Sequence, residues 1–431
     1  MSAYFHFYLC GRITAEWLIN MIKKEKAHFY VEKYDRFRQE LLLDFVREDE
    51  FLYFRNHGDY TPDMHLSDGK YEPTMLLVYG CSPQKTLRRG AILTLDMDCL
   101  MEMRNESNNI SENNNLSDDN DKHPATVFLE IFDGARFVNL IDAPDRCSVS
   151  TQIPKEYIVR LDSSRFGSPC TLNNLGENVE LHVWNVGQGN TNCISDKVNL
   201  TLFDFGASFY YSDSKLSTIL NDHMDFMEGH DSVSLIISHW DIDHYNLLCV
   251  AQEDFLQSLC RVSYPDKGVG VTMKQVAARI IKNCTWRNAI ESPTPKIGRK
   301  CGIQKIFEGN RYALFMGERS KNKNNSGLLL LVFNDTATAL LTADHSNYQI
   351  WNQVYPFVCE RGNILHIVVP HHGGDCGKTP IPHEVVSGDA AISVGSNMYG
   401  HPKPKTIASY IDAGYSIIRT DRYGRDVIIR L

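Results

Sequence analysis

Several features common in other protein classes are missing from this chain of 431 residues. No stretch approaches the roughly 18 apolar residues that a membrane-spanning helix needs, and the opening Met-Ser-Ala-Tyr-Phe lacks the basic and apolar regions of a signal peptide. The twelve cysteines are scattered, without a Cys-x-x-Cys pair, which is typical of reduced thiols. We therefore expect a cytoplasmic protein with no membrane partner.

An excess of positive charge is also missing. The formal net charge is −9, so no global basic field attracts nucleic acid, and any such contact requires a local basic patch. Residues 286–310 offer one candidate, which could steer an anionic substrate, and an ordinary solvated surface is the alternative. Its basic residues are Arg287, Lys296, Arg299, Lys300 and Lys305.

The length predicts two domains rather than one. A turn-rich segment at 163–169 is the candidate linker, between an N-terminal α+β domain at 1–170, whose function the sequence does not indicate, and a second domain at 178–431. Residues 104–123 have almost no large apolar side chains and predict a disordered insertion. Within the first domain, apolar runs predict strands at 4–9, 74–79, 91–95 and 127–131, and residues 31–56 suit an amphipathic helix followed by a strand.

The segment Ser-His-Trp-Asp-Ile-Asp-His at 238–244 directly follows an apolar run that predicts a buried strand. In extended backbone, alternate side chains share a face, so His239, Asp241 and Asp243 can converge. His244 is out of phase, and it joins the same site only if the chain bends or if it serves a second metal ion. The alternative is a polar surface loop. Four imidazole and carboxylate groups after an apolar strand favour a metal site.

The same pattern, an apolar strand followed by residues that can bind metals or substrates, recurs along the second domain. Strand ends far apart in the sequence can meet at one edge of a layered sheet structure, which is the expected place for an active site. The positions that follow such strands are 204, 239–244, 344, 371–372 and 397–401.

Eight short segments in this order resemble the ComEC-type soluble domain of metallo-β-lactamase-fold hydrolases, over about residues 178–431. They are Asn-Val-Gly-Gln-Gly-Asn (185–190), Asp-Phe-Gly (204–206), the 238–244 segment, Asn-Asn-Ser (324–326), Leu-Leu-Thr-Ala-Asp (340–344), His-His-Gly-Gly (371–374), Tyr-Gly-His-Pro (399–402) and Arg-Thr-Asp-Arg-Tyr-Gly (419–424).

The chain also departs from that pattern at several positions. The family has Asp at the places of Asn185 and Asn190, Ile-Gly-Gly at 245–247, Gly at Ala343 and Ser at Gly374. The change at 245 could reshape the mouth of a substrate site.

The resemblance implies an α/β fold, the αββα metallo-β-lactamase sandwich, with the N-terminal domain as an addition. It also implies two divalent metal ions, and the mixed Asp and His set is compatible with Zn²⁺ or Mn²⁺. One ion would be bound by His239 and Asp241 and the other by Asp243 and His244. Asp344 would bridge the ions, and His371 or His372 would complete the set. Ser326 occupies a place where many enzymes of this fold have a further His.

This similarity implies a metal-dependent phosphodiesterase or nuclease that acts on nucleic acid or nucleotides through a metal-activated hydroxide. Asp243 would orient the attacking group, and His401 would stabilise charge or protonate the leaving group, as would whichever of His371 and His372 is not a ligand. Asn397 and Ser326 would donate to a phosphoryl oxygen. Hydrolysis of an ester, thioester or lactam is one alternative. Another is a binding or regulatory protein with a vestigial site, and a protein partner at the N-terminal domain is a further hypothesis.

Overall fold

The computed structural model describes the strands of the first 160 residues and most of the chain from residue 172 onward. In the first part these are residues 4–10, 26–35, 40–46, 75–78, 92–96, 126–130 and 158–159. From residue 172, the description omits 173–174, 177, 210, 212, 267–270, 296–300, 321, 362–363, 396 and 398–399. The predicted disordered insertion at 104–123 lies outside the described residues. The chain divides into two compact units, with most of the first in residues 1–151 and the second beginning at Gln152.

The first unit contains an antiparallel sheet of six strands in the order β5-β2-β3-β4-β1-β6. Its strands are β1 (Tyr4–Cys10), β2 (Lys26–Asp35), β3 (Glu40–Val46), β4 (Met75–Val78), β5 (Ile92–Asp96) and β6 (Thr126–Glu130). The helix predicted within residues 31–56 is wrong, because β2 and β3 pair there with Val31 opposite Leu43. Aromatic and β-branched side chains of β2, such as Phe29, Tyr30 and Val31, suit a strand better than a helix.

The second unit is built from two sheets. The eight-stranded sheet has the order β21-β8-β9-β10-β11-β12-β13-β7, and the seven-stranded sheet has the order β14-β15-β16-β17-β18-β19-β20. The strands of the larger sheet are β7 (Ile158–Val159), β8 (Glu180–Val183), β9 (Asn192–Ser195), β10 (Asn199–Phe203), β11 (Ser232–Ile236), β12 (Arg261–Pro265), β13 (Arg287–Ile290) and β21 (Val427–Arg430). Those of the smaller sheet are β14 (Ile303–Glu308), β15 (Tyr312–Gly317), β16 (Leu328–Phe333), β17 (Ala337–Leu341), β18 (Ile364–Val368), β19 (Ser387–Ile392) and β20 (Ser416–Arg419). Strand β7 belongs to this unit although it lies before the predicted linker at 163–169.

Helices and short turns connect these strands. The helices are α5 (Asp213–Glu228), α6 (Leu247–Val250), α7 (Glu253–Ser258), α8 (Val271–Asn283), α9 (Asn347–Gln349), the π-helical η6 (Ile350–Val354), α10 (Tyr355–Cys359), α11 (Pro404–Asp412) and α12 (Thr420–Tyr423). The 3₁₀ turns are η4 (Ile242–His244), η5 (Lys323–Ser326) and η7 (Pro370–Gly373). None of the helices in the described part of the chain has the length and apolar character that crossing a membrane requires.

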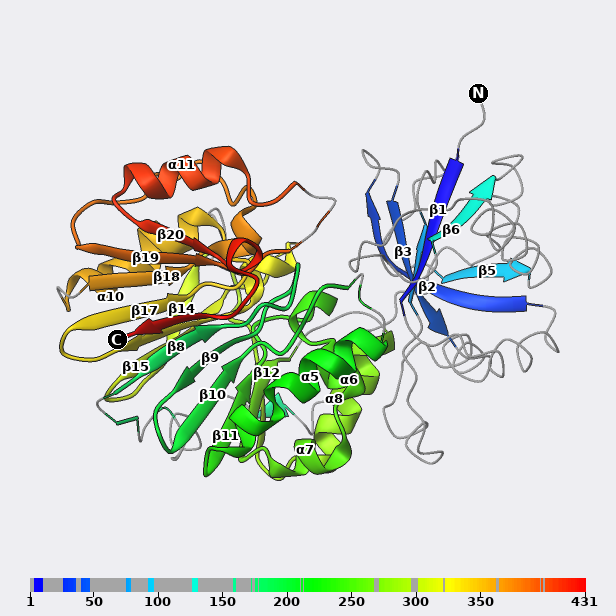
Figure 1. The fold of residues 1–431 in the computed structure, drawn as a ribbon, viewed down its shortest axis with the longest axis horizontal. Coiled ribbons are helices and arrows are strands. Elements are labelled where there is room, and N and C mark those ends of the chain that lie inside the picture. The colour runs from blue at the N-terminus through cyan, green and yellow to red at the C-terminus, as the bar shows by residue number, and fades with distance from the viewer. Residues whose placement is uncertain are drawn as a thin grey trace. The chain divides into compact units, whose positions relative to one another are not determined.

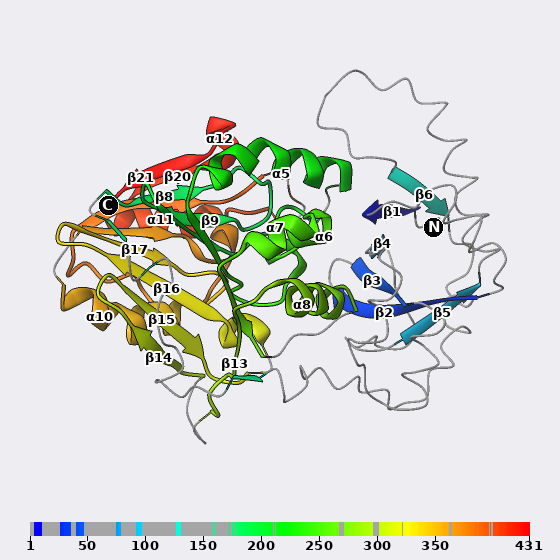
Figure 2. The same ribbon diagram turned by 90° about the horizontal axis from the view of Figure 1, so that it is seen from below.

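The two sheets pack face to face, and helices cover their outer faces (Figures 1 and 2). Strand β16 shows why its sequence is a continuous apolar run. Leu328 and Leu330 face the other sheet in one core, whereas Leu329 and Leu331 pack in a second core with Trp351 of η6 and the helices α10 and α11. A strand that is buried on both faces carries no polar alternation. The second unit is therefore an αββα sandwich, as in the metallo-β-lactamase fold.

Each sheet is antiparallel on one side and parallel on the other. Strands β10 and β11 are parallel in the larger sheet, and β17, β18 and β19 are parallel in the smaller one. Parallel strands end at the same edge of a sheet, so the residues that follow them are brought together. The segments after these five strands contain the positions that the sequence singles out, at 204, 239–244, 344, 371–372 and 397–401.

Candidate metal centre

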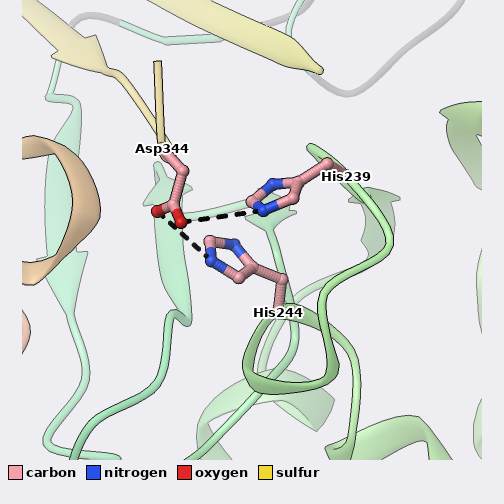
Figure 3. Close-up of side chains that lie close together, drawn as sticks. All are labelled: His239, His244 and Asp344. Atoms are coloured by element: carbon pink, nitrogen blue, oxygen red, sulfur yellow. Dashed lines mark ion pairs between the residues drawn. The ribbon is translucent and has the colours of Figure 1, made fainter. Parts of the chain in front are cut away.

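Three buried side chains from the two sheets converge in a first ligand group, His239, His244 and Asp344 (Figure 3). His239 and His244 come from the segment after β11, and Asp344 follows β17. Nε2 of His239 lies 3.8 Å from Oδ2 of Asp344, and Nε2 of His244 lies 3.4 Å from its Oδ1. One metal-binding atom from each residue lies within 4.8 Å of the others. A divalent cation prefers this mixed imidazole and carboxylate environment.

A second ligand group, Asp243, His244 and His372, adjoins the first. Nε2 of His372 lies 3.4 Å from Oδ2 of Asp243. His244 belongs to both groups, and this dual role follows from the bend in its segment. The chain is extended at Asp241 and then turns into η4, where the His244 N–H donates to the Asp241 carbonyl oxygen at 2.9 Å. The bend brings His244, which is out of phase in an extended chain, toward both groups.

The ring orientations of His244 and His372 test whether the site suits a metal ion. Nδ1 of His372 lies 2.8 Å from the Ser393 carbonyl oxygen, and Nδ1 of His244 lies 2.8 Å from Oδ2 of Asp204. A carbonyl oxygen only accepts, so Nδ1 of His372 donates to it, and Nε2 is left to face Asp243. The Nε2 atoms of both residues are buried and make no hydrogen bond. Buried ring nitrogens that face carboxylates fit a cation site, because a cation can lie between them, and outer partners of this kind orient metal-binding histidines.

Asp204, which the sequence singles out only by its position after a strand, is the main supporting residue of the site. Its carboxylate is fully buried and accepts from the Ser238 N–H at 2.6 Å and the Ser238 hydroxyl at 2.8 Å. Asn190 Nδ2 donates to its Oδ2 at 2.9 Å. An Asp at position 190 would place a second carboxylate there, so the departure from the family pattern at Asn190 has a local reason. The signal for Asp204 was its position at a strand end in Asp-Phe-Gly.

Charge within the site keeps the carboxylates ionised. Burial raises the pKa of Asp243, but the interaction with His372 and the charge of His244 outweigh it and lower that pKa to about 2. The pKa of Asp344 is held well below its usual value against burial, mainly by His371 and His244. Burial would lower the pKa of His244, but Asp204 and Asp344 raise it well above 6.5. In the metal-free protein, His244 therefore carries the positive charge that a bound cation would replace.

The two adjacent histidines differ in their surroundings. The side chain of His372 is 4% exposed and lies beside Asp243, whereas that of His371 is 39% exposed and its Nδ1 lies 2.6 Å from Oδ2 of Asp344. Both have left-handed backbone with φ of 52°, and Asp204 and Ala343 also have positive φ. Such backbone is uncommon for residues with a Cβ and is concentrated at functional sites. Here the two neighbouring rings face different carboxylates, His371 that of Asp344 and His372 that of Asp243.

Asp241 lies at the margin of the site. Its Oδ2 is 3.6 Å from Nε2 of His239, and it is in neither ligand group. The grouping thus differs from the pairing that the resemblance implies, because His244 adjoins both Asp344 and Asp243. The role of Asp241 as a ligand stays a prediction.

Two side chains that are predicted to contact substrate already form hydrogen bonds within the protein. The Ser326 hydroxyl donates to the Glu318 carbonyl oxygen at 3.0 Å and accepts from the Ser320 N–H at 2.9 Å. The Asn397 side chain donates to the carbonyl oxygens of Gly395 and His401 and accepts from the His401 N–H at 3.0 Å. Donation by these groups to a phosphoryl oxygen stays a prediction and would require these hydrogen bonds to break. In this structure Asn397 closes the loop that carries His401.

His401 lies beside the metal centre. Its ring centroid is 5.4 Å from that of His371, and its Nδ1 is 3.4 Å from Nε2 of Gln188. Burial and the nearby His371, His372 and Lys403 lower its pKa to about 3, so the ring is neutral at physiological pH. Gly374 makes the approach of the two rings possible. A Cβ at this residue would lie 2.6 Å from Cδ2 of His371 and 2.8 Å from Cε1 of His401.

Two further expectations concern the surroundings of the site. Tyr245 is buried and its ring packs against Trp240 at 5.4 Å, so this departure from the family pattern belongs to the core rather than to an open mouth. In the predicted basic rim, Lys305 pairs with Glu308 and Arg287 donates to the Cys284 carbonyl oxygen at 2.9 Å. The other members, Lys296, Arg299 and Lys300, lie outside the described residues, and steering by this rim stays a prediction.

No protein-family model and no curated protein matches the chain. Among solved structures, it is similar to the metallo-beta-lactamase fold protein YhfI from Bacillus subtilis, with 11% identity over 59% of this chain and 100% of that one, at a TM-score of 0.36. It is also similar to Tm1679, a metal-dependent hydrolase of the beta-lactamase superfamily, with 14% identity over 59% and 99% of the two chains and a TM-score of 0.35. A mutant of CmlA beta-hydroxylase shares 14% identity over 65% of this chain and 60% of its own, with a TM-score of 0.33.

Proposed function

We propose that this protein is a metal-dependent hydrolase that cleaves phosphodiester bonds in nucleic acid or nucleotides. The observation that carries the proposal is the pair of adjoining ligand groups that share His244 at one edge of the sandwich. Two divalent cations bound there, Zn²⁺ or Mn²⁺, would lower the pKa of a bound water and neutralise charge on the attacking and leaving oxygens of a displacement. The ComEC-type resemblance of the sequence motifs supports a phosphodiester rather than an ester, thioester or lactam as substrate.

The residues of the site have distinct tasks in this proposal. His239, Asp344, Asp243, His244 and His372 hold the cations, with Asp204 and the Ser393 carbonyl oxygen fixing the two rings that face Asp243 and Asp344. Asp243 stays ionised at neutral pH because its pKa is about 2, so it is also able to orient a water through its carboxylate. His371 lies next to Asp344 and is partly exposed, so its ring can contact a substrate. The neutral ring of His401 is the second group for substrate contact.

The proposal is tested by metal content and a substrate panel. Purified wild-type protein is analysed for bound metal, and is then supplied with Mn²⁺ or Zn²⁺ and incubated with single- and double-stranded DNA, RNA, cyclic dinucleotides, and chromogenic esters and lactams. Cleavage of a phosphodiester that is lost in Asp243→Ala supports it. Metal binding with hydrolysis of esters or lactams alone assigns a different substrate class. A protein that neither contains nor takes up metal is a binding or regulatory protein instead.

A further inference from the structure

The 3₁₀ turn η5 brings an additional polar side chain to the first ligand group. Asn324 Nδ2 lies 3.1 Å from Oδ2 of Asp344, the same oxygen that lies 3.8 Å from Nε2 of His239. Asn324 is half-buried and comes from the connection between β15 and β16, a part of the chain that contributes no member of either ligand group. Its carboxamide therefore reaches the centre from a different side of the fold.

The turn is fixed in place without help from any metal. The Asn324 N–H donates to the Asn322 side chain at 3.2 Å, and Gln349 Nε2 donates to the Asn325 carbonyl oxygen at 2.8 Å. Two glycines allow close packing around it. A Cβ on Gly317 would lie 2.0 Å from the Asn325 carbonyl oxygen, and one on Gly327 would lie 2.8 Å from the Ser238 carbonyl oxygen and 3.2 Å from Cβ of His239. The turn is thus pressed against the segment that carries His239, which pre-organises Asn324.

The Asn324 side chain has a different kind of hydrogen-bond partner from those of the two polar residues that follow it. Asn325 Oδ1 accepts from the Ser346 N–H at 3.2 Å, and the Ser326 hydroxyl is bonded to Glu318 and Ser320. These two side chains hold the turn to its neighbours. The Asn324 side chain instead points to a carboxylate of the ligand group. A carboxamide has a donor and an acceptor that exchange places when it rotates by half a turn, so it can present nitrogen to a carboxylate and oxygen to a cation.

The additional oxygen makes the two ligand groups chemically unequal. His244 lies between the two groups and has one ring nitrogen, Nε2, to offer a cation, so the comparison of the groups rests on their other members. The second group adds one imidazole and one carboxylate, from His372 and Asp243. The first adds His239 and Asp344, with the Asp241 carboxylate and the Asn324 carboxamide beside them. Carboxylate and carbonyl oxygens favour hard cations such as Mn²⁺, and imidazole suits Zn²⁺.

We propose that Asn324 is a metal-contacting residue of the first ligand group, and that its carboxamide oxygen makes this group select a hard cation such as Mn²⁺ over Zn²⁺. The inference rests on the metal centre of the proposed function and adds a residue and a selectivity to it.

The test measures metal binding and not catalysis. Wild-type protein and variants are stripped with a chelator and titrated calorimetrically with Mn²⁺ alone and with Zn²⁺ alone. Circular dichroism checks that each variant is folded. We expect two sites in the wild type. In Asn324→Ala, the Mn²⁺ affinity of one site falls by at least about tenfold, a loss of the size caused by removing groups that support metal ligands. Asn324→Asp, which keeps an oxygen, retains Mn²⁺ binding, and Asn324→His shifts the same site toward Zn²⁺.

Two variants of the same turn serve as matched controls. Asn325→Ala and Asn322→Ala remove side chains that bind within the turn and its neighbours, and both should keep the Mn²⁺ affinity of the wild type. If Asn322→Ala lowers the affinity as much as Asn324→Ala, the cause is the loss of the turn and the inference is wrong. If Asn324→Ala binds both ions like the wild type, the inference fails while the metal centre stands. If the wild type binds neither ion, the metal centre and the inference fail together.

Discussion

The metal centre and the His223–Asp426 pair, both in the second unit, combine histidine with aspartate but use the imidazole ring differently. At the metal centre, His244 and His372 each bind a partner through Nδ1 and leave a buried Nε2 without a hydrogen bond. The His223 ring of α5 has both nitrogens occupied, with Nδ1 2.8 Å from the Ile219 carbonyl oxygen and Nε2 3.0 Å from Oδ2 of Asp426. The second ring nitrogen therefore distinguishes a candidate ligand from a structural histidine.

The charge on the two kinds of histidine follows from the same difference. Both partners of His223 are acceptors, so both its nitrogens donate and the ring is an imidazolium, which stacks on Trp184 at 3.8 Å. Burial opposes this charge, but the bond to Asp426 and the Ile219 carbonyl oxygen raise the pKa of His223. His223 thus has its charge balanced within the protein. At the metal centre, carboxylates surround His244, and a bound cation would balance their negative charge.

The largest expected effect comes from removing a charged ligand, the half-buried Asp243. Asp243→Ala should reduce phosphodiester hydrolysis by roughly a thousandfold, or about 4 kcal/mol of transition-state stabilisation, because the second ligand group loses its carboxylate. Initial rates at saturating Mn²⁺ measure this. His223→Gln is the matched control, and it should retain activity within about threefold. An equal loss in both variants would remove the distinction between the two sites.

A smaller loss is expected when only the support of a ligand changes. Asp204→Asn replaces an acceptor of Ser238, Asn190 and His244 by an amide, so His244 is no longer held by a carboxylate. Metal affinity should fall by about 10- to 100-fold, as for other outer partners of metal-binding histidines. Calorimetric titration with Zn²⁺ and Mn²⁺ measures it. Asp426→Asn, the equivalent change at His223, should leave the affinity unaltered, and a comparable decrease there would contradict the comparison.

The pH dependence of metal uptake should reveal the charge on His244. The pKa of this ring is raised well above 6.5, so it is protonated at neutral pH in the metal-free protein and must lose its proton to become a ligand. Affinity should rise with pH, by up to tenfold per unit for one displaced proton, until the pH exceeds that pKa. Titrations at pH 6, 7 and 8 in buffers of different ionisation enthalpy measure the affinity and the proton release. Affinity that does not change over this range would be inconsistent with a protonated His244.

The smallest expected effect concerns stability at the structural pair. His223→Gln should lower the free energy of unfolding by about 1 kcal/mol near pH 6. Because the folded pKa of His223 is raised, its contribution is complete below the unfolded pKa of about 6.5 and is lost as the pH rises through the folded pKa. The pKa of Asp426 is lowered, mainly by His223 against burial, so its contribution is lost as the pH falls through its folded pKa.

Urea unfolding of wild type and variant at pH 6 and pH 9 measures this difference. A larger difference between the two proteins at pH 9 than at pH 6 would have the wrong sign for an imidazolium. Metal content should be the same in both proteins, because neither His223 nor Asp426 contacts a ligand group in the described part of the chain.

Local sequence patterns predicted much of the second unit. Apolar runs mark strands, and the residues that follow five of them lie at one edge of the sandwich, because β10 and β11 are parallel in one sheet and β17, β18 and β19 are parallel in the other. The αββα fold is confirmed by the two sheets and their outer helices. In the first unit, the sequence of residues 31–56 predicts a helix where β2 and β3 pair, because mixed charged and apolar stretches are ambiguous until their strand partners are known.

The roles of individual site residues depend on contacts between distant parts of the chain, which no local sequence pattern predicts. His371 and His372 are adjacent, identical in type and alike in their left-handed backbone, and only their contacts in the fold separate a partly exposed ring from a buried one. The Ser326 and Asn397 side chains resemble substrate contacts in the sequence, but each is bonded to neighbours within the fold. Asp204 and Asn324 are ordinary polar residues until their distances to His244 and Asp344 are measured.

The pairing of β8 with β21 has a consequence for how this unit folds. Glu180 pairs with Arg430 across 250 positions of the chain, so the edge of the larger sheet forms only after the intervening segment has been brought into place. Closing so long a loop costs entropy before any contact compensates for it, and such non-local pairing slows folding. The Asp426 segment, which binds Asn185 and His223, depends on the same closure. We expect this edge to be among the last parts of the unit to assemble, after the strands that position the metal ligands.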